Sequence, residues 1–207
     1  MAIEAVVACA ESEQAISRMD GFEARLRALF PAIGMLHPEG GSGDVSLAHV
    51  LQTAALALQA QAGCPVTFAR TTATIDPGVY QVVVEYSEEA VGRQAFEDAQ
   101  RLINAALGQG DFDAEAAIAN LRELDEDERL GPSTGAIVDA AVARDIPFRR
   151  LTRGSLVQFG WGSRQRRIQA AEIDSTSAVA ESIGQDKDLT KRLLHAAGVP
   201  VPLGKPV

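Results

Sequence analysis

The residues His49, Gln52 and Thr53 stand at the spacing of a His-x-x-Glu-His metal-peptidase helix. That chemistry needs two imidazoles four residues apart, which grip zinc from one helical face, and a glutamate between them that takes a proton from the metal-bound water. Only the first histidine is present here. Gln52 cannot act as a carboxylate base and Thr53 is a poor zinc ligand. We therefore expect no metal site, and we interpret His49 as a packed or hydrogen-bonded helix residue.

A second candidate lies in the stretch GPSTGAIV, where Gly131 and Gly135 permit a tight turn into a helix. Ser133 and Thr134 can cap that helix, and its free backbone N–H groups can meet an anion. A capped loop and helix without any ligand would have the same sequence, so both interpretations stay open.

The run SLVQFGWGSRQRRIQAAE predicts a hairpin that turns at GWGS and carries three arginines after the turn. Strand alternation would place Arg164 and Arg166 on one side of the hairpin and Arg167 on the other. A forked guanidinium suits a carboxylate, which makes these arginines candidates for binding one. The alternative is an exposed, charged hairpin without a ligand.

Composition excludes several classes of protein. The formal net charge of −9 argues against a general nucleic-acid binder. No apolar run approaches the roughly 18 residues needed to cross a bilayer, and the first residues do not resemble a signal peptide. Cys9 and Cys64 both lie in apolar surroundings, so we expect buried free thiols in a reducing cytoplasm. Charge is uneven, because residues 111–129 are acidic and residues 144–167 are rich in arginine.

The elements that must position these residues follow from the hydrophobic periodicity. The first part has the predicted order β-α-α-β-β-α, with helices on one side of a small sheet, which is an α+β fold. Ser46 or Asp44 would cap the second helix after a loop over 38–44, and Ser87 would cap the third. The predicted strands are 3–10, 64–74 and 78–86, and the predicted helices are 11–30, 46–62 and 87–107.

After residue 110 we expect a change of organisation. The pattern predicts a helix over 114–122, then a glycine-serine turn, a helix and a strand within 130–151, the hairpin, and finally two capped helices in 175–183 and 186–198. The chain ends on VPVPLGKPV, which we interpret as the lead-in to a strand, and this ending predicts a fragment of a longer enzyme. The predicted parts are 1–110, 111–170 and 171–207.

Several of these motifs, in this order, closely resemble the cyanophycin synthetase family. The resemblance rests on LGPSTGAIVDAAVARDIPFRRL, SLVQFGWGSRQRRIQA, DSTSAVAESIGQDKDLTKRLLHAAGVPVPLGKPV and, nearer the N-terminus, SLAHVLQTAALALQAQAG with DPGVYQVVVEY. It is weakest in residues 1–40. It implies that the chain is an N-terminal α+β domain, then a βα segment, then the first helices of an ATP-grasp module.

Proteins of that family build a polymer with an aspartate backbone and an arginine on each β-carboxylate. The resemblance implies that this chain binds the polymer in the cytoplasm and is not itself catalytic. It also implies ATP and Mg²⁺ as cofactors of the full-length enzyme but none in this chain, and a homo-oligomer for the full-length enzyme. The charge and the short apolar runs already led us to expect no nucleic-acid partner and no membrane partner. The implied polymer-binding residues are Ser133, Thr134, Arg164, Arg166 and Glu181, the last pairing with a substrate arginine.

Two alternatives stay open beside this interpretation. In some family members the helix that matches residues 46–63 carries the complete His-x-x-Glu-His and resembles a zinc site that cuts the polymer, which makes His49 a degenerate remnant. A zinc peptidase is therefore the weaker alternative for this chain. The stronger alternative is a free-standing, degenerate N-terminal-domain protein with a scaffolding or regulatory role.

Overall fold

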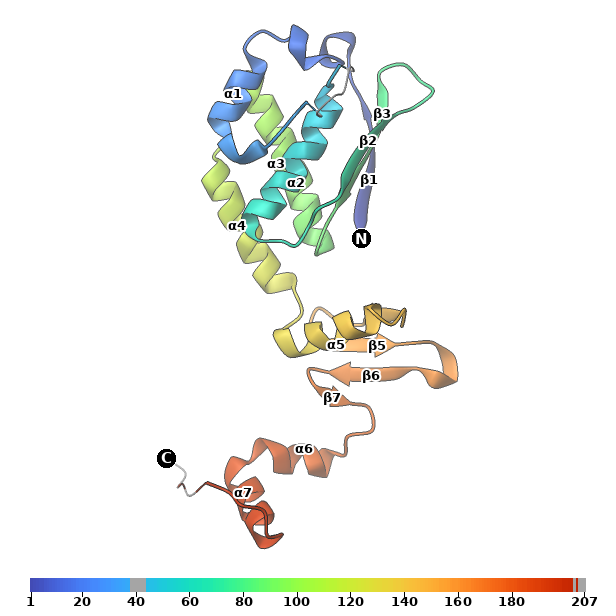
Figure 1. Ribbon diagram of the computed structural model, residues 1–207, viewed down its shortest axis with the longest axis vertical. Coiled ribbons are helices and arrows are strands. Elements are labelled where there is room, and N and C mark those ends of the chain that lie inside the picture. The colour runs from blue at the N-terminus through green and yellow to red at the C-terminus, as the bar shows by residue number, and fades with distance from the viewer. Residues whose placement is uncertain (38–43, 203, 205–207) are drawn as a thin grey trace. The chain divides into compact units, whose positions relative to one another are not determined.

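The computed structural model describes residues 1–37, 44–202 and 204, and the chain divides into two compact units, Met1–Arg129 and Leu130–Val207 (Figure 1). Most of the predicted loop over 38–44 and the end of the predicted strand lead-in lie outside the described residues. No helix in the described part is long and apolar enough to cross a membrane.

The first unit is built on a three-stranded antiparallel sheet of β1 (Ala2–Ala8), β2 (Ala69–Ala73) and β3 (Val79–Glu85), in the order β1-β3-β2. The central strand β3 alternates as the sequence predicted, because Val82 and Val84 are buried under the helices while the intervening residues are not. Helices therefore cover one face of the sheet, and the predicted α+β class is confirmed (Figure 1).

Four helices complete this unit, namely α1 (Phe22–Leu29), α2 (Leu47–Ala62), α3 (Glu89–Ala106) and α4 (Ala114–Glu128). The most extensive packing between helices joins α2 to α3, and α2 also lies on β2 and β3. Each large side chain that this packing removes from water contributes about 1.5–3 kcal/mol. The largest buried side chains of the unit are Phe22, Leu26, Phe30, Ile33, Leu58, Leu102 and Leu121.

The predicted long helix over residues 11–30 is wrong in its first half. This segment forms two single 3₁₀ turns, Glu11–Glu13 and Ile16–Arg18, and α1 begins only at Phe22. The Ile16 amide donates to the Val45 carbonyl at 2.8 Å instead of continuing a helix, and Gly21 adopts a left-handed φ of 64° directly before α1. After α1 a third 3₁₀ turn, Pro31–Ile33, returns the chain toward α2.

Two helix boundaries also differ from prediction. The N-cap of α3 is Glu88, because the predicted cap Ser87 instead donates to the Asp125 carboxylate of α4 at 3.3 Å. The helix α4 extends to Glu128 and packs on α2 and α3. The boundary between the compact units consequently falls after Arg129, whereas the sequence pattern placed the change of organisation at residue 110.

The second unit contains α5 (Pro132–Val142) and the antiparallel strands β4 (Phe148–Arg150), β5 (Leu156–Phe159), β6 (Arg166–Gln169) and β7 (Glu172–Ile173) in chain order. The predicted hairpin is confirmed as β5–β6, with a 3₁₀ turn at Gly162–Arg164. Val138 of α5 packs on Val157 and Ile168 of the sheet. The unit ends with the two predicted helices, α6 (Ala178–Gln185) and α7 (Lys187–Ala196), whose N-caps are Ser177 and Asp186.

Candidate functional site

The side chain of His49 takes part in capping the start of α2, the helix on which it lies. Ser46 is the N-cap of α2, and the Nδ1 atom of His49 accepts the Ser46 backbone N–H at 3.3 Å and lies 2.8 Å from the Ser46 hydroxyl oxygen. A glutamate or glutamine takes this place in the ordinary capping box, where it reaches back to the N-cap amide. The imidazole also meets the Tyr80 ring edge-on, with the ring centroids 5.7 Å apart. The prediction that His49 is a packed or hydrogen-bonded helix residue is confirmed, and the ring is in fact both.

Gln52 and Thr53, the other two positions of the metal-peptidase spacing, are not arranged as metal ligands either. The Thr53 hydroxyl donates to the His49 backbone carbonyl at 2.9 Å. The Oε1 atom of Gln52 is buried without a hydrogen-bond partner among the described residues.

Burial lowers the pKa of His49, which keeps the ring neutral and able to accept the Ser46 N–H at physiological pH.

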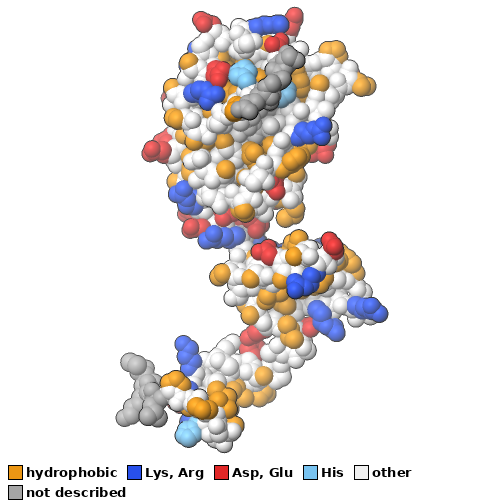
Figure 2. All heavy atoms as spheres, viewed as in Figure 1, with side chains coloured by type: hydrophobic (Ala, Val, Ile, Leu, Met, Phe, Trp, Pro, Cys, Tyr) orange, Lys and Arg blue, Asp and Glu red, His pale blue; other side chains and the backbone are white. Residues whose placement is uncertain are grey.

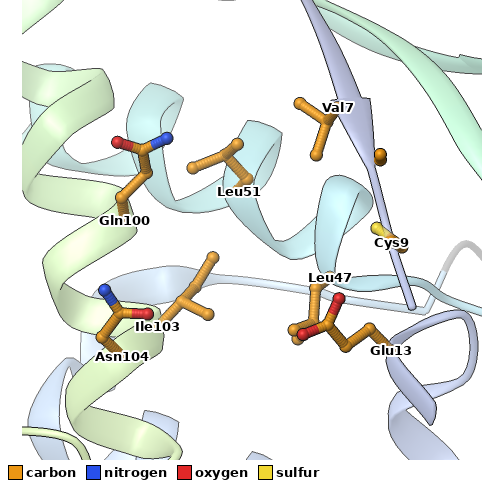
Figure 3. Close-up of a pocket in the computed structure, with 9 residues that line it drawn as sticks. Val7, Cys9, Glu13, Leu47, Leu51, Gln100, Ile103 and Asn104 are labelled. Carbon is orange, nitrogen blue, oxygen red and sulfur yellow. The ribbon is translucent and has the colours of Figure 1, made fainter.

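A hollow of about 360 Å³ lies between β1, the first 3₁₀ turn, α2 and α3 (Figure 3). Gln100 and Asn104 stand one turn apart on α3, and Glu13 faces the hollow from the opposite side (Figure 3). One Glu13 oxygen accepts the Ala10 amide at 2.8 Å. The sequence pattern did not indicate this hollow, because its lining comes from four separated elements. The lining residues are Val7, Ala8, Cys9, Glu13, Leu47, Leu51, Gln100, Ile103 and Asn104.

Both cysteines are buried free thiols, as predicted. Burial raises the pKa of Cys9, while the Ala48 backbone and the Ser46 hydroxyl, which contact the thiol, oppose that rise. Burial also raises the pKa of Cys64, whose Sγ lies 3.8 Å from the Asp125 carboxylate. Neither thiol is therefore poised as a thiolate nucleophile.

The predicted capping by Ser133 or Thr134 is wrong. The N-cap of α5 is Gly131, Pro132 occupies the first turn, and no side chain caps the helix. Ser133 is exposed, whereas Thr134 is buried and donates its hydroxyl to the Ala170 carbonyl at 3.2 Å. Thr134 thus ties the start of α5 to the end of β6, and only Ser133 is free to meet a ligand.

The three hairpin arginines do not all follow the strand alternation that the sequence predicted for them. Arg164 ends the 3₁₀ turn and β6 begins at Arg166, so Arg164 does not share a strand face with Arg166. Arg166 stands opposite Phe159, and Arg167 stands opposite Gln158, which itself pairs with Arg149 of β4. The row Arg149, Gln158 and Arg167 therefore crosses the sheet on the face opposite to α5.

That open face carries a second hollow, of about 300 Å³. It brings the predicted residue Glu181, from α6, together with Arg167 and with two carboxylates that the sequence analysis did not select, Glu172 and Asp174. Glu181 keeps one hydrogen bond, from the Gln185 amide at 3.0 Å. Ser133, Thr134, Arg164 and Arg166 do not line this hollow. Its other lining residues are Leu156, Ile168, Gln169, Ile173 and Thr176.

The electrostatics of this hollow are mixed. Three carboxylates and one guanidinium line it, and within the described part of the chain the Arg167 guanidinium makes no ion pair. Figure 2 shows acidic and basic side chains close together on the visible face of the second unit. Such a site can accept a cationic group and a carboxylate of one ligand at the same time.

Comparison with known proteins places these features in context. Residues 5–108 match the family described as the cyanophycin synthase-like N-terminal domain. Over 161 residues, 76% of this chain, the sequence is 42% identical to the cyanophycin synthetases of Trichormus variabilis and of a Nostoc species. It is 40% identical to that of Geminocystis herdmanii over the same length. The matched region is 18% of the length of each relative.

Proposed function

The chain belongs to the cyanophycin synthase-like N-terminal domain family, and on that premise we propose that it is the polymer-binding region of a cyanophycin synthetase. In this proposal the whole enzyme is an ATP-dependent ligase that builds multi-L-arginyl-poly-L-aspartate. The present chain holds the polymer and catalyses nothing alone. A cytoplasmic location and a homo-oligomeric full-length enzyme are parts of the same proposal.

The observation that carries the proposal is the mixed charge of the hollow on the open face of the β4–β7 sheet. Each unit of the proposed polymer presents a guanidinium and the carboxylate of its arginine. The Arg167 guanidinium suits that carboxylate, and the carboxylates of Asp174 and Glu181 suit the guanidinium. Glu181 thereby keeps the role that the family resemblance implied for it, while Arg167 joins it as the partner for negative charge.

The expected affinity per unit is modest. Exposed ion pairs contribute about 0.2–1 kcal/mol each. Screening acts over roughly 8–10 Å at physiological salt, so several pairs are needed and each weakens as salt rises. Binding should therefore increase with the number of units in the ligand and decline steadily with salt.

ATP and Mg²⁺ enter the proposal only as cofactors of the full-length enzyme. The segment from α6 to α7 has a single glycine, Gly184, and no glycine-rich loop that could enclose phosphates, so we assign it no nucleotide site. Lys187 is exposed on α7 and Lys191 follows one turn later, and neither lines the hollow that carries the proposal. We derive no step through ATP from this chain.

The test is a calorimetric titration of the 207-residue chain with short soluble Asp-Arg segments at two salt concentrations. We expect binding that weakens at the higher salt, and weaker binding by Arg167→Ala and Glu181→Gln. Arg166→Ala and Ser133→Ala test the residues that the resemblance implied, and Lys187→Ala is the exposed control that should leave affinity unchanged. Absence of binding by the wild-type chain at millimolar segment would reject polymer binding and favour the scaffolding role.

A further inference from the structure

Trp161, the only tryptophan of the chain, stands at the tip of the β5–β6 hairpin. Its side chain is 60% exposed, although tryptophan is mostly buried in folded proteins. Glycines flank it on both sides, and Gly160 and Gly162 have left-handed φ values of 66° and 61°. A residue with a Cβ is strained in that region, so the sequence Gly-Trp-Gly suits a turn that presents the indole.

The turn that carries Trp161 is compact. The Gly160 amide donates to the Pro147 carbonyl at 2.8 Å, and the Gln165 amide donates to the Gly162 carbonyl at 3.3 Å. A Cβ at Gly160 would stand 3.7 Å from the backbone oxygen of Arg164, so the two sides of the turn lie in contact. Trp161 and Arg164 therefore lie in the same compact turn at the tip of the hairpin, with the Trp161 side chain exposed.

Two unpaired cations accompany the indole. Arg164 lies in the same turn, and Arg166 stands opposite Phe159 on the first rung of the hairpin. Both arginines are exposed. Neither forms an ion pair within the described residues, and the Arg166 guanidinium donates only to the neighbouring Gln165 carbonyl, at 3.2 Å. The backbone limits the Cα separation of Trp161 and Arg164 to at most about 11 Å.

This combination restricts the ligand. A bare cation would be repelled by the arginines, whereas the face of an indole attracts a cation and stacks well with a planar guanidinium. A carboxylate suits the arginines but leaves the indole unused. A ligand that carries a guanidinium and a carboxylate a side chain apart satisfies both, and an arginyl unit is such a ligand.

We propose that Trp161 is a stacking platform for the guanidinium of an arginyl unit of the polymer, and that Arg164 and Arg166 bind the carboxylate of the same unit. The inference rests on the proposed function, which supplies the polymer, and it adds a recognition site at the hairpin tip. It also gives Arg164 and Arg166 a task that differs from that of Arg167 on the open sheet face.

The test uses Trp161 as its own reporter, because no other tryptophan contributes to the emission. Short Asp-Arg segments should change the Trp161 emission and protect it from quenching by acrylamide. Segments in which citrulline replaces arginine keep the shape and the carboxylate but lack the positive charge, and they should have a much smaller effect. Segments with an amidated arginine carboxylate should also bind more weakly, because Arg164 and Arg166 then lose their partner.

Calorimetry on variants completes the test. Trp161→Leu should lower affinity for Asp-Arg segments about two- to five-fold per stacked unit, and Trp161→Phe should lose less. Phe68→Leu, at an aromatic side chain of the first unit that is 52% exposed, is the matched control and should bind as the wild type does. Thermal unfolding of each variant establishes that it is folded.

The outcomes separate this inference from the proposed function. Wild-type affinity in Trp161→Leu together with unchanged emission would overturn the stacking platform and leave polymer binding in place. Absence of any binding by the wild type would overturn both. A stronger emission response to a single-stranded oligonucleotide than to Asp-Arg segments would also overturn the platform, because bases stack on exposed tryptophan next to arginine as well.

Discussion

Replacement of His49 by alanine should destabilise the first unit by removing the acceptor at the start of α2. The Ser46 amide now donates to Nδ1 of His49 at 3.3 Å, and Ser46 is completely buried. Loss of the ring leaves that N–H without its acceptor, which costs about 1–3 kcal/mol. The edge-on contact with Tyr80 is lost as well. We therefore expect the free energy of unfolding to fall by about 2–3 kcal/mol.

His49→Gln is the matched variant. A glutamine at the third helical position can reach back to the N-cap amide, as in the ordinary capping box, so the substitution should cost less than about 1 kcal/mol. The comparison separates the hydrogen bond from a general intolerance of substitution at this position.

The same geometry predicts a pH dependence. Burial lowers the pKa of His49 in the folded chain below the ordinary imidazole value of 6.5. As the pH falls below 6.5, the unfolded chain therefore takes up a proton before the folded chain does. The free energy of unfolding decreases as the pH falls from there toward the lowered pKa. The wild type should retain this contribution above pH 6.5 and lose it progressively as the pH falls toward the lowered pKa. His49→Gln has no imidazole and should lack this component.

The measurement is urea unfolding followed by circular dichroism from pH 5 to 8, with hydrogen exchange of the α2 amides. Hydrogen exchange of the α2 amides reports the first unit, Trp161 fluorescence reports the second, and circular dichroism reports the helices of both. A loss below about 0.5 kcal/mol in His49→Ala, with the pH dependence of the wild type retained, would refute the capping role of the ring.

Two further predictions concern the expected absence of a metal site at His49 and the start of α5. The chain should purify without stoichiometric zinc and should not cut the polymer, since Gln52 and Thr53 replace the carboxylate base and second ligand; about one zinc per chain, with cleavage lost in His49→Ala, would contradict this. Thr134→Val should destabilise the second unit by about 1 kcal/mol through loss of the bond to the Ala170 carbonyl. Ser133→Ala, one residue away and exposed, should change stability by less than about 0.5 kcal/mol. Urea unfolding followed by Trp161 fluorescence measures both, and equal effects would contradict the assignment.

Periodicity by itself determined most of the elements. Alternation identified the side of β3 that meets the helices, because neighbouring side chains of a strand face opposite ways. The other strands of the first sheet were predicted from short runs of β-prone residues. For α2 the sequence predicted Asp44 or Ser46 as the N-cap and an end before Gly63, and Ser46 and Gly63 occupy the two caps. The motifs quoted above also indicated the family, which the comparison then established.

Local pattern failed where distant contacts determine the conformation. The residues before α1 have helical spacing, yet the Ile16 amide bonds to Val45, which no helical periodicity can show. Ser87 has the identity of a helix cap, yet its hydroxyl bonds to Asp125 of another helix. The extent of the first unit likewise depends on the packing of α4 against α2 and α3.

The candidate site was predictable only in part for the same reason. The sequence indicated that the residues after the hairpin turn are basic, but the choice among them depends on where β6 begins, and its start at Arg166 directs Arg167 to the open face. Glu181 acquires neighbours only because α6 and the strand β7 border one hollow. Residue types determine which charges and rings the chain can offer, whereas the meeting of separate elements decides which of them can touch one ligand.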